Sequence, residues 1–171
     1  MIADAVRFCD VWALAQKGGR AQGELALRQL PRLAAELVDT EGSLQYRLDG
    51  LIDDRGRAAA RFEVDGVVNV RCDRCGESVP LPIHEGAQFF FVADEAELAG
   101  LPIDESPEEP LLGSDRFDLA ALVEDQVILA LPISPRHDHC SSPGAGADDR
   151  RCPAETRRPF AVLAALKKPG R

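Results

Sequence analysis

The stretch VVNVRCDRCGESVPLPI, residues 67–83, decides the fold of this chain. Apolar and polar residues alternate along VVNVR, and apolar side chains again occupy every second position in SVPLPI. The segment between the two runs contains the pair Cys72 and Cys75, followed directly by Gly76. An alternation with period two on both sides of a glycine-containing break predicts two antiparallel strands joined by a turn.

Further alternating runs extend this hairpin in both directions. Residues 44–49 and 62–71 alternate between apolar and polar side chains, with the glycine-containing break DDRGR between them. The last run covers residues 79–92, where Gly86 predicts a bulge or a bend. The sequence therefore predicts an antiparallel meander whose second turn carries the C-x-x-C segment.

Helical patterns lie on either side of the meander. The segment VWALAQ at 11–16 is stopped by a Gly-Gly pair, and residues 30–38 carry a proline where the first turn of a helix tolerates it. Residues 117–131, FDLAALVEDQVILAL, form a broad apolar stripe in which Glu124 and Asp125 predict a narrow polar face. We expect an α+β fold, an antiparallel β-sheet meander with packed helices and the C-x-x-C turn in a hairpin.

The length of 171 residues and the hydrophobic content of 45% suffice for one domain with a real core, predicted over residues 1–136. Residues 94–114 are rich in acids and prolines and are expected to form an exposed acidic loop within that domain. Residues 137–158 have the composition of a flexible linker with a His/Cys cluster. Residues 159–171 are expected to form a basic C-terminal helix.

The net charge of −9 argues against a protein that coats nucleic acid through bulk electrostatics. The charge is unevenly spread, however, because residues 150–171 hold seven bases and one acid. Such a segment is either ordinary solvated surface or a local contact for RNA. The side chains expected to contact RNA or another partner are Arg157, Arg158, Phe160, Lys167 and Lys168.

Several classes of protein are disfavoured by the sequence. No apolar run reaches the length of a membrane span, and the N-terminus lacks the features of a secretory signal, so we expect a cytoplasmic protein. Its five cysteines are then expected to be free thiols, metal ligands or redox groups rather than structural disulfides. Phosphate-binding loops, dinucleotide fingerprints and metalloprotease helices are missing from the sequence. We expect no enzymatic activity and no small-molecule substrate.

The segment CDRCG has the form of a zinc knuckle. In such a turn two thiolates point to one side, and glycine permits the backbone conformation that the turn requires. Further ligands are available in RHDHC, residues 136–140, and beyond it. His139 and Cys152 are alternatives within this set. The predicted ligands of one structural zinc ion are Cys72, Cys75, His137 and Cys140.

Two other interpretations of Cys72 and Cys75 stay open at this point. A redox pair prefers the N-terminus of a helix in a βαβ unit, whereas this motif follows one strand and precedes another. In the absence of a catalytic role, the thiols of the metal-free protein are expected to keep ordinary pKa values of about 8 to 9. The third interpretation is a simple turn with inert thiols.

The order of these pieces resembles a known family. The strand–CDRC–strand turn, an acidic loop, LVEDQVILALPISPRHDHC and a terminal RPFAVLAALKK are together similar to the YceD family, the large ribosomal RNA subunit accumulation proteins. The resemblance aligns Cys72 and Cys75 with the family's C-x-x-C pair, and His137 and Cys140 with the histidine and cysteine that follow LALP. The family is associated with accumulation of 23S ribosomal RNA in bacteria and plastids and has no established catalytic activity.

The resemblance implies a non-enzymatic factor that helps to make or stabilise the large ribosomal subunit. Its partner would be ribosomal RNA, a pre-50S particle or a protein of that pathway. An alternative is a zinc-stapled protein-interaction adaptor whose C-terminal helix docks in a groove of another protein, without direct RNA contact. A thiol oxidoreductase is the third candidate.

Overall fold

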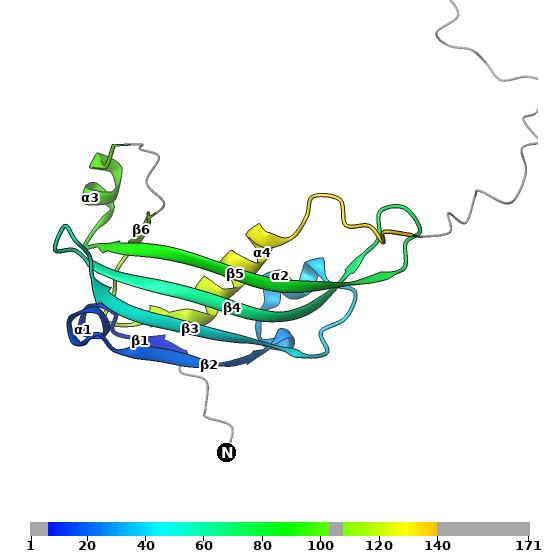
Figure 1. The fold of residues 1–171 in the computed structure, drawn as a ribbon, viewed down its shortest axis with the longest axis horizontal. Helices are drawn as coiled ribbons and strands as arrows, with labels where there is room; N and C mark the ends of the chain where they lie inside the picture. Colours follow the sequence, from blue (N-terminus) through cyan, green and yellow to red (C-terminus); the bar gives the residue numbers. More distant parts are fainter. Residues whose placement is uncertain (1–6, 103–107, 140–171) are drawn as a thin grey trace, which may run out of the picture.

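The computed structural model describes residues 7–102 and 108–139, which form a curved five-stranded sheet with helices packed against it (Figure 1). In spatial order the strands are β2 (Arg20–Ala26), β3 (Ser43–Ile52), β4 (Ala58–Arg71), β5 (Ser78–Val92) and β6 (Glu108–Leu112). The helices are α1 (Val11–Lys17), α2 (Pro31–Glu36), α3 (Glu95–Gly100) and α4 (Leu119–Ala130), with a short 3-10 turn at Leu27–Gln29. A separate two-stranded ribbon pairs β1 (Phe8–Cys9) with β7 (Phe117–Asp118).

The expected α+β fold is confirmed, since β2 to β5 form an antiparallel meander with helices packed on it. Strand β2 was not expected, and two details of the strand pairing also differ from the expectation. The register between β4 and β5 runs without a slip through the pair Glu63 and Gly86, so the bulge expected at Gly86 is wrong. Strand β6 pairs parallel to β5, which the sequence pattern did not indicate.

Residues 94–100 are mostly exposed, as expected, but the expected loop is wrong, because the described part of 94–114 contains α3 and β6. Asp94 caps α3 by accepting a hydrogen bond from the backbone N–H of Glu97, and β6 follows on the other side of residues 103–107. The physical reason is a second apolar cluster on the outer face of the sheet. Its buried members are Ala59, Phe90 and Val92, with Leu51, Leu98 and Leu101 packed against them.

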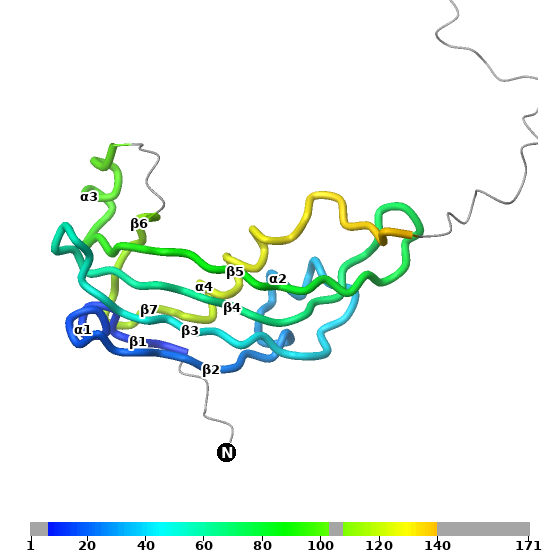
Figure 2. The backbone as a smooth tube through the Cα atoms, in the orientation of Figure 1, coloured from blue at the N-terminus to red at the C-terminus, as the bar shows by residue number. Residues whose placement is uncertain are grey.

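The main core lies between the inner face of the sheet and the helices on that side. Figure 2 shows α4 crossing the strands diagonally on the face that also carries α2. The apolar stripe expected on α4 is confirmed at its centre, because Leu119, Val123 and Val127 are fully buried. These side chains join Phe62 of β4, Phe89 of β5 and the alternating residues of β3 in one cluster. The strands within residues 67–83 thus belong to a sheet whose inner face packs against α4.

Glu124 departs from its expected place on a polar, solvent-facing stripe. It is only 5% exposed, although it sits on the helix that covers the sheet. Its Oε1 accepts hydrogen bonds from the backbone N–H groups of Arg32, at 2.6 Å, and Leu33, at 3.0 Å. These donors lie in the first turn of α2, where the N-cap residue Leu30 offers no side-chain acceptor. Glu124 therefore caps α2 from another helix.

Asp125 has a simpler role beside Glu124. Its carboxylate pairs with Arg32 at 2.6 Å and is half exposed, and Glu124 contacts the same guanidinium through Oε2 at 3.0 Å. The two adjacent acids thus converge on one arginine, which joins α4 to α2. The side-chain hydrogen bonds from Asp125 and Glu124 raise the pKa of Arg32 above its usual value.

The cap predicts a graded series of stability losses. Glu124→Ala leaves two N–H donors without acceptors and is expected to lower the free energy of unfolding by about 2 kcal/mol. Glu124→Gln keeps an amide oxygen for both donors and is expected to cost less than about 1 kcal/mol. Asp125→Ala removes a solvent-exposed pair and is expected to cost about 0.5 kcal/mol or less. Urea unfolding of the three variants measures the series; equal losses for Glu124→Ala and Asp125→Ala would contradict the cap.

Candidate metal centre

The C-x-x-C segment forms the loop that joins β4 to β5, whose register closes with Arg71 opposite Ser78. Two backbone hydrogen bonds fold this loop: Gly76 N–H donates to the Cys72 carbonyl at 2.9 Å, and Cys72 N–H donates to the Glu77 carbonyl at 2.8 Å. Gly76 has φ +78°, in the left-handed region that favours glycine. The sequence CDRCG therefore specifies its own turn.

The segment that follows α4 returns to this loop, as Figure 1 shows where residues 131–139 meet the β4–β5 connection. The backbone N–H of Asp73 donates to the carbonyl of Pro135 at 2.9 Å. Two residues later, His137 Nε2 lies 3.0 Å from the carbonyl of Ser78. Chain segments about sixty residues apart in sequence are thus joined at one end of the sheet.

Three potential metal ligands meet at this junction. The Sγ atoms of Cys72 and Cys75 and a ring nitrogen of His137 all lie within 4.8 Å of one another. His137 Nδ1 is 3.5 Å from Cys75 Sγ. Because Nε2 of the ring is the nitrogen that donates to the Ser78 carbonyl, Nδ1 is left with its lone pair toward the sulfur atoms. The carbonyl of Ser78 therefore orients the ring for ligation through Nδ1.

The surroundings favour the thiolate form of Cys72. Burial raises the pKa of this thiol, but the backbone N–H groups of Cys75, His137 and Arg74 outweigh burial and lower the pKa from 9.0 to about 5. The N–H of Arg74 lies 3.4 Å from the sulfur. The expectation of ordinary thiol pKa values is therefore wrong for Cys72. The pKa is low because backbone N–H groups of the folded chain point at the buried sulfur and stabilise its negative charge.

The pKa of His137 is also shifted by the Cys72 side chain. Its hydrogen bond with the Cys72 side chain raises its pKa above 6.5, burial opposes this, and the Ser78 carbonyl adds to the rise. A metal ion competes with that proton for the ring, so acid is expected to weaken metal binding here.

This donor set suits a borderline-soft ion. Two thiolates and one imidazole are three of the four ligands of a tetrahedral structural zinc site. The described residues can therefore hold a metal ion, and the expected Cys72, Cys75 and His137 are brought together. Within the described ranges His139 lies outside the group. The remaining expected ligand Cys140, its alternative Cys152 and the expected contact residues Arg157, Arg158, Phe160, Lys167 and Lys168 lie outside the described residues.

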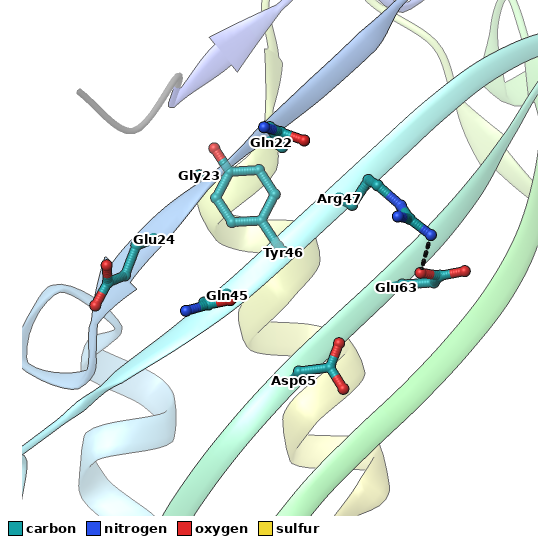
Figure 3. A pocket seen from close by; sticks show the side chains of 8 residues that line it. All are labelled: Gln22, Gly23, Glu24, Gln45, Tyr46, Arg47, Glu63 and Asp65. Atoms are coloured by element: carbon teal, nitrogen blue, oxygen red, sulfur yellow. Dashed lines mark hydrogen bonds and ion pairs between the residues drawn. The ribbon is translucent and has the colours of Figure 1, made fainter. Parts of the chain in front are cut away.

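The surface also has a hollow of about 370 Å³ on the outer face of β2, β3 and β4. Figure 3 shows that polar side chains of three strands surround it, among them Gln22, Gln45 and Asp65. Arg47 forms ion pairs with Glu63 and Asp49 across this face. The lining also includes the acids Glu24 and Asp65, and Asp65 contacts His84. Exposed ion pairs of this kind contribute little to stability.

Sequence reasoning missed two groups that build the metal centre. The carbonyls of Ser78 and Pro135 hold the returning segment against the loop, and backbone atoms have no sequence signature of this kind. One of the two could have been suspected from the hairpin. In the antiparallel register Ser78 lies opposite Arg71, directly before Cys72. In the part of the chain that the structure describes, no helix is long and apolar enough to cross a membrane.

Comparison with known proteins gives the chain a family. The profile described as "Large ribosomal RNA subunit accumulation protein YceD" matches residues 60–167, which include the knuckle and the returning segment. A protein of that name from Haemophilus influenzae is 31% identical over 151 residues, covering 85% of this chain and 86% of the relative. No solved structure shows a significant match. The profile covers more than half of the chain and the relative most of it, and the protein accordingly belongs to the YceD family.

Proposed function

We propose that this protein is a non-enzymatic factor in the accumulation of 23S ribosomal RNA, acting in biogenesis of the large ribosomal subunit in the cytoplasm. The observation that carries the proposal is the match to a family described by large ribosomal RNA subunit accumulation, over residues 60–167. The relative that bears the same name aligns along most of both chains, which supports a shared role for the whole protein.

The site chemistry supports a binding role rather than catalysis. The most perturbed thiol of the described residues, Cys72, is buried and lies close enough to Cys75 and His137 to share a metal ion with them. The arginine in the hollow on the outer face, Arg47, is held in ion pairs with Glu63 and Asp49. A catalytic role as a thiol oxidoreductase draws no support from the setting, because the motif joins two strands instead of opening a helix.

We further propose that the metal is one structural zinc ion held by Cys72, Cys75 and His137, with Cys140 as the fourth ligand. Cys140 is proposed because it follows only three residues after His137 in the sequence. Such an ion would tie the β4–β5 loop to the segment after α4. The ion would act by stabilising this junction, since a closed site with four protein ligands leaves no position for a substrate.

The partner is proposed to be ribosomal RNA or a pre-50S particle, contacted by the basic C-terminal segment. Residues 150–171 carry seven bases and one acid on a chain of net charge −9. Each phosphate that a cation neutralises releases counterions, which gives such contacts their salt dependence. The side chains assigned to this contact are Arg157, Arg158, Phe160, Lys167 and Lys168.

Changing Arg157, Arg158, Lys167 and Lys168 to alanine is expected to weaken association with RNA or pre-50S particles and to flatten its salt dependence. The free energy of unfolding is expected to change by less than about 1 kcal/mol, as for other surface substitutions. Binding measured at several salt concentrations provides the check. A matched control removes four exposed cations of the folded body: Lys17, Arg28, Arg55 and Arg61. If both sets of substitutions weaken RNA binding equally, the C-terminal segment is not the specific contact.

Sedimentation of cell extracts tests the proposed function against the adaptor alternative. Co-migration with pre-50S particles that is lost on ribonuclease treatment supports direct attachment to RNA. Co-migration that survives ribonuclease favours a protein partner and the zinc-stapled adaptor. A protein that stays at the top of the gradient, separate from the ribosomal particles, would contradict the proposed function.

A further inference from the structure

We propose that Cys72 and Cys75 form an oxidation-sensitive clasp, in which a peroxide converts the two metal-binding thiolates into a disulfide and releases the metal ion. The inference rests on the metal centre proposed above and adds a regulation of that same site. It starts from the position of the sulfur atoms, which lie within 4.8 Å of each other in one short loop.

The loop geometry allows the two sulfur atoms to approach one another. The hydrogen bond from Gly76 N–H to the Cys72 carbonyl closes the turn around both cysteines. Oxidation has to bring the sulfurs from within 4.8 Å of each other to the bonded distance of about 2 Å. His137 contacts the pair through its Nδ1, which lies 3.5 Å from Cys75 Sγ.

The difference in exposure assigns the order of the two steps. Cys72 is 1% exposed, whereas Cys75 is only partly buried. A peroxide therefore reaches Cys75 first. The Cys75 thiolate attacks one peroxide oxygen, the O–O bond breaks, and the departing hydroxide takes a proton to become water.

The second step closes the disulfide. The Cys72 thiolate attacks the sulfur of the Cys75 sulfenic acid, the S–S bond forms, and the S–O bond breaks with loss of a second hydroxide, which is protonated to water. In total two thiolates, one peroxide and two protons give one disulfide and two waters. The pair of sulfurs loses two electrons and the peroxide gains them. Since a disulfide is a poor metal ligand, the ion is left with too few ligands and dissociates.

Loss of the ion changes how the segment after α4 is held. Its remaining attachments to the loop include the hydrogen bond from Asp73 N–H to the Pro135 carbonyl and that between His137 and the Ser78 carbonyl. Pro135 and His137, which make these two bonds, precede the basic segment at residues 150–171 in the sequence. Oxidation is therefore expected to loosen the anchor of the proposed contact with ribosomal RNA.

Cys9 supplies an internal control in the same chain. It is half-buried on the edge ribbon, and burial followed by the charge of Asp10 raises its pKa to about 11. It therefore stays a thiol and reacts slowly with peroxide. A Cys9→Ser variant should retain the full response of the clasp.

The test uses the full chain, reduced and loaded with zinc, treated with hydrogen peroxide. Zinc release is followed with a chromophoric chelator, and disulfides are mapped by mass spectrometry after alkylation of free thiols. We expect about one zinc ion released per Cys72–Cys75 disulfide, in wild type and in Cys9→Ser, with recovery after addition of dithiothreitol and zinc. Hydrogen exchange at the Asp73 amide should become faster in the oxidised form.

Other outcomes overturn the inference in distinguishable ways. Zinc can be released without a Cys72–Cys75 disulfide, when the thiols form sulfinic acids or pair with Cys140 or Cys152. That result would contradict the proposed disulfide but not the proposed metal centre. A disulfide that forms while zinc stays bound would contradict the proposed release of the metal ion. Reduced protein that contains no zinc overturns the metal centre itself, and this inference with it.

Discussion

Replacing Cys72 with serine is expected to lower the free energy of unfolding of the zinc-loaded protein by several kcal/mol. Cys72 is nearly buried between the loop and the returning segment, and the binding energy of a structural zinc ion is also folding energy. Wild-type protein treated with a chelator should show a similar loss. Cys72→Ser treated in the same way should show no further change in Tm, because its site is already lost.

Elemental analysis and thermal melting together measure this effect. Wild type purified without chelator is expected to hold roughly one zinc ion per chain, and Cys72→Ser less than about 0.2. Cys9→Ser is the matched control, because Cys9 lies outside the ligand group and its change should stay within about 1 kcal/mol. An unchanged Tm of the wild type in chelator would show that no structural metal is present.

Gly50→Ala is expected to lower the free energy of unfolding by about 3 kcal/mol, the upper end of the range for overpacked cores. A Cβ atom at Gly50 would lie 2.5 Å from the Leu14 carbonyl oxygen and 2.8 Å from the Ala15 nitrogen. Both atoms belong to the backbone of α1, so no side-chain rotation can relieve the overlap. The segment just after α1 is also bound here, because the Gly50 N–H donates to the Gly19 carbonyl at 2.9 Å.

Gly86→Ala provides the control for this substitution. Gly86 also lies inside a strand, but the nearest atom to a Cβ there is the Phe62 carbonyl oxygen, at an ordinary 3.6 Å. Its replacement is expected to be neutral or to stabilise by up to about 1 kcal/mol, because alanine has fewer unfolded conformations to lose. Urea unfolding of both variants separates the two sites. Losses of similar size would mean that α1 does not pack against Gly50 as described.

The parts of the fold that could be predicted are those with a strong local pattern. Period-two alternation located the β3–β4 and β4–β5 hairpins, and the broad apolar stripe located α4. Strand β2 was missed because its inward positions include the small residues Ala21 and Gly23, which weaken the apolar alternation. The burial of Glu124 was missed because its partners belong to α2, about ninety residues earlier in the chain.

The candidate site was predicted to a similar extent. The spacing of Cys72 and Cys75 in a glycine-containing turn indicated two ligands, and the His/Cys cluster near residue 137 indicated the rest. Sequence left His137 and His139 as alternatives, and the choice depends on the carbonyls of Ser78 and Pro135. The lowered pKa of Cys72 likewise comes from backbone N–H groups that only the folded turn brings together.

The central claim, a role in accumulation of large-subunit ribosomal RNA, is tested most directly by the ratio of 23S to 16S ribosomal RNA in cells that lack this protein. We expect the ratio to fall on deletion, to recover when the wild-type gene is restored, and to stay low when the restored gene carries the changes at Arg157, Arg158, Lys167 and Lys168. The same amount of each protein must be present in the complemented cells. A ratio in the deletion strain equal to that of the parent strain would contradict the account.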